Sequence, residues 1–205
     1  MARNENPPFD RGSSYYNNFA SSTGSTTDGV QLEGKEWMFE DFNPATKTLR
    51  SNQYVKCRVV RNTSAGVLLP SRLANLAVAP NSNGAFGGQV DGYATTLAQR
   101  AYPIDEFLPA GGVQVNDLFW IVTEGPAMVL TDLAALTGVI SIGSKVVAQT
   151  AVTSGATTAG RVLLQDLTGA TAPLANQAQN YVGHAMTAAT TSQTNASILV
   201  NVGHW

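Results

Sequence analysis

Hydrophobic residues gather in short runs along the chain, and the most apolar run lies near its centre. Leu118 to Val122 are five consecutive large apolar residues, and apolar residues resume from Ala127 to Leu130. A run this short, rich in aromatic and β-branched residues, predicts a buried strand rather than a helix. Gly125-Pro126 is expected to end its pairing, because proline lacks the amide hydrogen that a strand ladder needs.

The two faces of this predicted strand carry different side chains. Side chains alternate along a strand, so Leu118, Trp120 and Val122 face one way. Phe119 and Ile121 then face the other way. Because both faces are apolar, both must be covered, either by the core of the domain or by another subunit. Phe119 and Trp120 are therefore candidates for the core or for a subunit interface.

A second strand is predicted from Tyr54 to Arg61, where apolar and charged residues alternate. Val55, Cys57 and Val59 would face inward, and Lys56 and Arg58 would face outward. The chain has one cysteine, so it cannot form an internal disulfide. We expect Cys57 to be a small buried apolar residue and not a nucleophile.

Other short apolar runs recur with turn-forming residues between them, and we expect strands there as well. They lie at residues 67–69, 90–103, 137–143, 145–150, 161–165, 181–188 and 197–202. Residues 71–79 suit either a short helix or a loop. Short strands at this spacing predict an all-β fold, a small β-barrel or sandwich domain with an extended N-terminal arm.

Residues 1–52 differ from the rest and are assigned to the arm, with residues 53–205 as the β-barrel-like domain. Residues 13–28 are mainly Ser, Thr, Asn, Tyr and Gly and cannot form a core of their own. Two aromatic groups could anchor the arm to another subunit, although a loose tail with a local hydrophobic knot is the alternative. Their members, the predicted contact residues, are Tyr15, Tyr16, Phe19, Trp37, Phe39 and Phe42.

Charge is scarce and unevenly distributed. Charged residues make up 13% of the chain and the net charge is −2, which disfavours a nucleic-acid binder. Eight of the twelve Lys and Arg residues lie at or before Arg61, and beyond Asp132 only Lys145, Arg161 and Asp166 are charged. Such a surface suits a protein packed against neighbours, or one exposed on a virion or outside a cell. The sequence has no signal-peptide core near its start and no run long enough for a membrane helix, so no membrane partner is expected.

The residue types that carry catalysis or metal binding are sparse. The two histidines, His184 and His204, together with one cysteine do not form a zinc pattern. The carboxylate pairs Glu40-Asp41 and Asp105-Glu106 could be catalytic, and Asp91 with Asp105 and Glu106 could bind calcium, but no known spacing supports either role. We therefore expect no enzyme activity, no metal and no cofactor.

Four segments stand out by their order along residues 53–205. They are Trp120 to Val129, Ile140 to Val146, Tyr181 to Met186, and Ser197 to Gly203. In this order they resemble motifs of the family of small phage head decoration (capsid cement) proteins, with Ser144 where that family commonly has an aspartate. The long arm and the glycine-rich segment at residues 80–88 depart from the family core, so their contacts cannot be carried over.

The resemblance implies a β-barrel-like domain that binds the outer surface of an assembled capsid, often as a homotrimer. Its partner would be the major capsid protein and its place the virion, with no enzyme activity and no cofactor. Three alternatives stay open. They are another virion structural protein such as a tail or head-fibre base, a carbohydrate-binding β module, and a hydrolase that uses Asp105 or Glu106.

Overall fold

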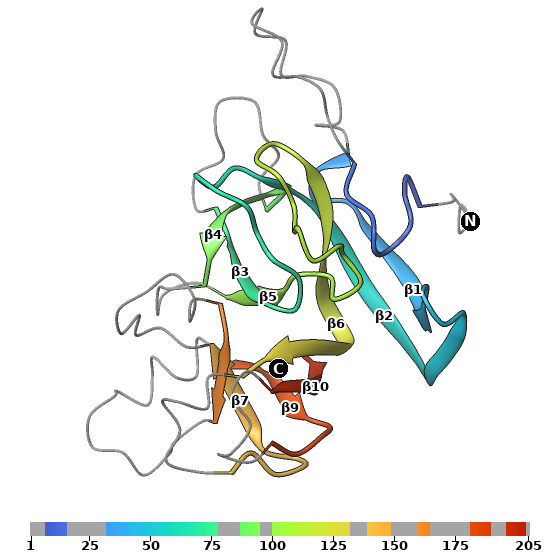
Figure 1. The fold of residues 1–205 in the computed structure, drawn as a ribbon, viewed down its shortest axis with the longest axis vertical. Coiled ribbons are helices and arrows are strands. Elements are labelled where there is room, and N and C mark those ends of the chain that lie inside the picture. The colour runs from blue at the N-terminus through green and yellow to red at the C-terminus, as the bar shows by residue number, and fades with distance from the viewer. Residues whose placement is uncertain are drawn as a thin grey trace, which may run out of the picture.

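The protein is an all-β structure, as the sequence predicts. The computed structural model describes residues 7–15, 32–77, 87–94, 100–131, 139–148, 160–164, 181–189 and 196–203. In this part of the chain the strands form one nearly closed, barrel-shaped sheet, and no α-helix is present (Figure 1).

The described residues form ten strands. They are β1 (Glu36–Asn43), β2 (Thr48–Asn62), β3 (Leu73–Leu76), β4 (Gln89–Tyr93), β5 (Ala101–Pro103), β6 (Leu118–Leu130), β7 (Lys145–Ala148), β8 (Val162–Leu164), β9 (Tyr181–Ala185) and β10 (Ser197–Val202). Their order in the sheet is β5-β3-β4-β2-β6-β10-β9-β7-β8, and β1 pairs with β2 beside this path. Residues 71–79, left open as helix or loop, contribute β3.

Strand β6 connects two halves of the sheet. Its first part, up to Glu124, pairs antiparallel with β2, and its second part, from Gly125 onward, pairs antiparallel with β10. We call the strands β1 to β5 with the first part of β6 the barrel half, and β7 to β10 with the second part of β6 the C-terminal half. Figure 1 shows the barrel half above the C-terminal half.

The expectation that Gly125-Pro126 ends strand pairing is wrong. The strand continues through both residues and exchanges β2 for β10 there, with Pro126 opposite Asn201. Proline removes a single donor, and it does so where β6 changes neighbours. Gly125 has a φ of 94°, and a Cβ atom on it would lie 2.4 Å from the Tyr54 carbonyl oxygen. The close approach of β2 therefore requires glycine at this corner.

The strands of the barrel half close around a small core. Strands β2, β4, β3 and β5 neighbour one another, and an isolated bridge between Ile104 and Ile121 joins the end of β5 to β6. The side chains of Phe119 and Ile121 belong to this enclosed cluster. Trp120 belongs to a larger cluster on the other face of β6, together with Leu118 and Val122. The predicted alternation along β6 is confirmed, because both of its faces are buried.

The β1–β2 hairpin extends away from the body of the barrel half (Figure 1). The boundary expected from the sequence at residue 52 falls inside β2, so residues 36–43 and 48–52 are part of the sheet. The stretch Pro7 to Tyr15 runs against β6, where Tyr15 and Leu118 exchange backbone hydrogen bonds of 2.8 and 3.1 Å. Local composition could not reveal this, because the partner strands lie far along the chain.

Candidate functional site

A buried network of charged groups fixes the β1–β2 hairpin close to its tip, next to the paired residues Phe42 and Leu49. It contains two arginines and three carboxylates from three separate segments of the chain. The members are Arg11, Asp41, Arg50, Asp105 and Glu106. Two of them come from the hairpin, so the network connects the hairpin to the N-terminal segment and to the loop between β5 and β6.

Arg11 holds one end of this network. Its Nη2 atom lies 3.0 Å from Oδ1 of Asp105, and the backbone N–H of Gly12 donates to Oδ2 of the same carboxylate at 2.6 Å. Burial opposes the charge of Arg11, but the carboxylates of Asp105 and Glu106 outweigh it and raise its pKa. The guanidinium also stacks on Phe107, 4.8 Å from the ring centre. Asp105 is fully buried, and Arg11 is its charged partner.

Arg50 holds the other end and reaches three acceptors. It donates to Asp41 at 2.7 Å, to Glu106 at 2.8 Å, and to the carbonyl of Pro126 at 3.3 Å. Glu106 also accepts the backbone N–H of Met128 at 3.2 Å. Burial raises the pKa of Glu106, and the bonds from Arg50 only partly offset this effect. The hairpin is thus bonded to the corner of β6.

These contacts bear on the carboxylates that the sequence analysis weighed as catalytic or calcium-binding groups. Asp105 and Glu106 are both engaged by arginines, and Asp41 is buried against Arg50 while Glu40 is exposed. Across the described ranges no group of three His, Cys, Asp or Glu side chains is placed to hold a metal ion. The network therefore has a structural role, which is to connect the hairpin, the N-terminal segment and the loop between β5 and β6.

Cys57 lies inside the same region and is fully buried, as predicted. Burial raises the pKa of its thiol to about 12, although the nearby Arg11 acts in the opposite direction. A thiol with this pKa is protonated at neutral pH and is a poor nucleophile.

Aromatic side chains surround Trp120, and this differs from what the sequence analysis expected of the arm. Trp37 and Phe39 were predicted to contact a neighbouring subunit. In the structure their rings pack edge-on against Trp120 of the same chain, with centroid distances of 5.4 and 5.1 Å. Phe9 contacts the same indole at 4.9 Å, and its carbonyl accepts the indole N–H at 3.2 Å. The physical reason is that β1 lies beside β2 and turns these rings toward the main core.

The other predicted contact residues have varied positions. Tyr15 is half exposed and stacks on Phe9, whereas Phe119 is fully buried in the enclosed cluster of the barrel half. Phe42 is exposed near the tip of the hairpin. Tyr16 and Phe19 lie outside the described residues.

The hairpin carries a set of exposed apolar side chains that the sequence analysis mostly missed. Met38 is 67% exposed, Tyr54 60% and Leu49 55%, and Phe42 lies directly opposite Leu49. The sequence did contain a pattern that predicts an outward Met38, because Met38 lies between the inward residues Trp37 and Phe39. It could only be interpreted once the inward face of β1 was known.

The tip of the hairpin is well ordered by its own hydrogen bonds. The Asn43 side chain accepts the backbone N–H of Ala45 at 2.9 Å, and the Asn43 carbonyl accepts that of Lys47 at 2.8 Å. Lys47 has a φ of 55°, which a tight turn requires. Phe42 and Leu49 are thus presented on a preorganised turn.

A groove of about 660 Å³ runs beside the hairpin, between the barrel half and the C-terminal half. Its wall includes Tyr54, Arg58, Arg100, Glu124 and His184. The Glu36 carboxylate lies 2.7 Å from Nζ of Lys56 and 2.7 Å from Nη2 of Arg58 in this groove. Partial burial raises the pKa of Glu36, but the bonds from Lys56 and Arg58 outweigh this effect and lower it. The groove therefore combines charged groups of both signs with apolar side chains and one exposed aromatic ring.

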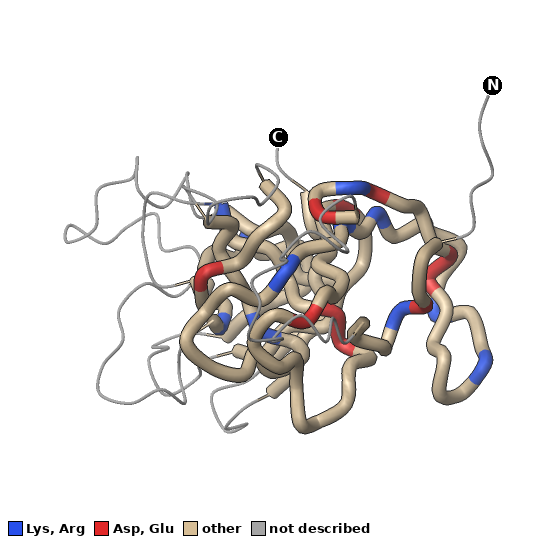
Figure 2. Tube along the Cα trace, turned by 90° about the horizontal axis from the view of Figure 1, so that it is seen from above, with Lys and Arg blue, Asp and Glu red and all other residues tan. Residues whose placement is uncertain are grey.

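The surface around these features is sparsely charged. Figure 2 shows long stretches of the described trace without Lys, Arg, Asp or Glu. No helix among the described residues is long and apolar enough to cross a membrane. No protein family, curated protein or solved structure matches the chain.

Proposed function

We propose that this chain is a structural virion protein, without enzyme activity, that binds the outer surface of an assembled phage capsid and bridges its subunits. The observation that carries the proposal is the β1–β2 hairpin, which exposes apolar side chains near its tip and is held by ion pairs directly beside them. The motif resemblance of residues 53–205 adds to it. The partner would be the major capsid protein, and the protein would act as a homotrimer.

The physical basis is binding that selects the assembled shell. A protein that contacts two neighbouring capsid subunits binds the assembled lattice and not the free subunits, so it stabilises the lattice by mass action. The ordered tip lowers the conformational cost of binding, because Phe42 and Leu49 need no rearrangement to meet a partner. The bonds from Arg50 to Asp41 and Glu106 fix the position of the hairpin relative to the loop between β5 and β6.

The test is co-sedimentation of the purified protein with capsids that lack it. We expect Phe42→Ser with Leu49→Ser to weaken binding by tenfold or more, since each apolar side chain contributes about 1.5–3 kcal/mol when fully buried. Ile142→Ser is the matched control, because Ile142 is 72% exposed but lies outside the hairpin. Equal binding by the double variant and the control would contradict the role of the hairpin, and no binding by the wild type would contradict the function.

The groove favours a second candidate, a carbohydrate-binding module. Exposed aromatic rings stack on sugars, and Tyr54 stands in the groove beside Arg58, Glu124 and other polar groups. Trp37 is not available for this role, because it packs on Trp120. Glycan binding that is lost on Tyr54→Ala but kept on Tyr15→Ala would favour this candidate, and absence of glycan binding would remove it.

A further inference from the structure

Strand β2 carries a bulge opposite Asp41 of β1. The two neighbours of Asp41 on β1 pair with Tyr54 and Leu49, which leaves residues 50–53 of β2 opposite Asp41 alone. A bulge bends its strand and changes the direction in which side chains point, and bulges are common next to functional sites. The residues of this bulge are therefore turned out of the regular ladder between β1 and β2.

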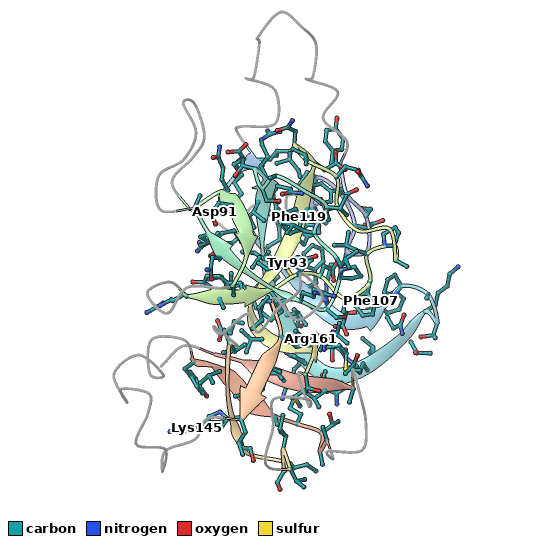
Figure 3. All side chains as sticks on the ribbon, turned by 60° about the vertical axis from the view of Figure 1, so that its left-hand side comes forward. Asp91, Tyr93, Phe107, Phe119, Lys145 and Arg161 are labelled. Atoms are coloured by element: carbon teal, nitrogen blue, oxygen red, sulfur yellow. The ribbon has the colours of Figure 1, made fainter. Side chains whose placement is uncertain are left out.

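Asp41 fixes the conformation of the bulge. Its carboxylate accepts a bond from Nη2 of Arg50 at 2.7 Å and one from the Ser51 hydroxyl at 2.8 Å. The Ser51 oxygen in turn accepts the backbone N–H of Gln53 at 3.2 Å. The Arg50 guanidinium carbon also lies 5.9 Å from the centre of the Phe107 ring, which Figure 3 labels beside the hairpin. The bulge is therefore preorganised, which lowers the entropy cost of binding a ligand.

The bulge opens onto the groove between the two halves of the sheet. Asn52, Gln53 and Tyr54 are consecutive exposed residues, and all three line the groove. A third carboxamide, that of Asn201, lines the groove from β10 of the C-terminal half. An aromatic ring beside carboxamides suits a sugar, because the ring packs on the apolar face of the sugar and the amides bond its hydroxyls. The groove volume of about 660 Å³ lies within the range of about 300–1,000 Å³ that is typical of small-molecule sites.

Positively charged side chains gather in the same groove. Among the described residues that line it, Lys56, Arg58 and Arg100 are cationic, and Glu36 and Glu124 are anionic. Three of the twelve Lys and Arg residues thus line one groove of a chain whose net charge is −2. Lys56 and Arg58 are bonded to Glu36, whereas Arg100, directly before β5, is exposed. A guanidinium group binds a carboxylate through two parallel N–H bonds, so the groove offers donors for a carboxylate beside its sugar-binding groups.

We propose that the groove binds a short saccharide that carries carboxylate groups. A sugar ring packs on Tyr54, the hydroxyls bond the carboxamides of the bulge and of Asn201, and a carboxylate bonds Arg100. The ligand therefore contacts both halves of the sheet. This inference rests on the carbohydrate-binding candidate described above and names its ligand class. It is separate from the capsid contact, since neither Phe42 nor Leu49 is among the described residues that line the groove.

The test is binding of the purified full chain to a glycan array that holds uronic-acid, sialic-acid and neutral saccharides. We expect binding to acidic saccharides. Conversion of their carboxylates to methyl esters should weaken binding by about tenfold or more, because it removes a charge-assisted hydrogen bond. Binding to uronic-acid or to sialic-acid saccharides supports the inference, and the two arms identify the source of the carboxylate.

Two matched variants locate the site. Arg100→Gln should weaken binding of the acidic saccharide by about tenfold and leave binding of its methyl ester unchanged. Lys47→Gln should bind as the wild type does, because Lys47 is exposed in the turn of the hairpin and is not among the described residues that line the groove. Since Arg100 and Lys47 are both exposed, both variants should keep the melting temperature of the wild type.

The inference is overturned if the methyl esters or the neutral saccharides bind as tightly as the acidic ones, or if Arg100→Gln and Lys47→Gln have the same affinity. Binding of neutral saccharides alone would overturn the ligand class and keep the carbohydrate-binding candidate. Absence of binding to every saccharide would remove both. None of these outcomes bears on co-sedimentation with capsids, which tests Phe42 and Leu49.

Discussion

The rings of Trp37 and Trp120 meet edge to face, with centroids 5.4 Å apart and planes at 78°. Trp37 comes from the hairpin and Trp120 from the central strand β6. This contact makes the hairpin part of the main core, and it leaves the outward residues of β1 and β2 free to contact a partner. The contact between Trp37 and Trp120 thus stabilises the fold, and only the exposed side chains of β1 and β2 can bind a partner.

Trp37→Ala is expected to lower the free energy of unfolding by about 2–4 kcal/mol. The change removes an aromatic contact and leaves a cavity beside Trp120, although Trp37 is only partly buried. Urea denaturation followed by circular dichroism measures it. Met38→Ala on the same strand is the control and should change the free energy by less than about 0.5 kcal/mol, because Met38 is mostly exposed. Equal losses in both variants would contradict the assignment of faces on β1.

Arg11→Met is expected to cost about 3–5 kcal/mol of unfolding free energy. It leaves the fully buried carboxylate of Asp105 without its partner, and an unpaired buried charge is costly. Lys56→Met removes an ion pair with Glu36 on the outer face of the hairpin and should cost less than about 1 kcal/mol. Urea midpoints at neutral pH give both values. If the two changes had the same small effect, the network would not fasten the hairpin.

Glu106 should make stability depend on pH in a definite direction. Because burial raises its folded pKa above 4.5, its contribution is fully present below pH 4.5 and is lost as the pH rises through the folded pKa. The wild type should therefore lose stability relative to Glu106→Gln as the pH rises above 4.5. Urea unfolding in steps from about pH 2.5 to pH 8 measures this difference.

Glu36 offers a control with the opposite sign. Its folded pKa is lowered by Lys56 and Arg58, so its contribution is present above pH 4.5 and is lost as the pH falls through the folded pKa. As the pH rises toward 4.5, the free energy of unfolding of the wild type should thus increase relative to that of Glu36→Gln. The same slope for both variants would mean that Glu106 does not carry the predicted shift.

Gly125→Ala should be strongly destabilising. A φ of 94° is unfavourable for alanine by about 1–3 kcal/mol, and the added Cβ would also collide with the Tyr54 carbonyl oxygen. Gly111→Ala is the matched control, since a Cβ at that position meets no atom within 4 Å. Thermal unfolding of both variants measures the contrast. A mild effect at Gly125 would show that the corner of β6 can shift, contrary to the packing described above.

Features set by neighbouring residues could be predicted from the sequence. The alternation of Leu118, Phe119 and Trp120 predicted that both faces of β6 are buried, and the pattern around Cys57 predicted a buried thiol. The all-β class followed from short apolar runs with turns between them. In each case the information lies within a few residues of the element concerned.

Features that depend on distant residues could not be predicted. Arg11 and Asp105 are 94 positions apart, and Arg50 and Glu106 are 56 positions apart, so no local pattern announces the network. Aromatic residues such as Trp37 and Phe39 occur both in cores and in interfaces, so their residue type does not distinguish the two. Only the pairing of β1 with β2 decides that they face Trp120.

The most direct measurement of the proposed function is a cryo-EM comparison of particles that carry the protein with particles from which it has been removed. The account predicts lost density on the outer capsid surface at three-fold positions, with the tip at Phe42 and Leu49 against the shell and with stripped heads that open at lower temperature. Lost density only at the tail or at a vertex would contradict the capsid-bridging function and favour a tail or head-fibre base. No lost density anywhere on the particle would contradict every virion role.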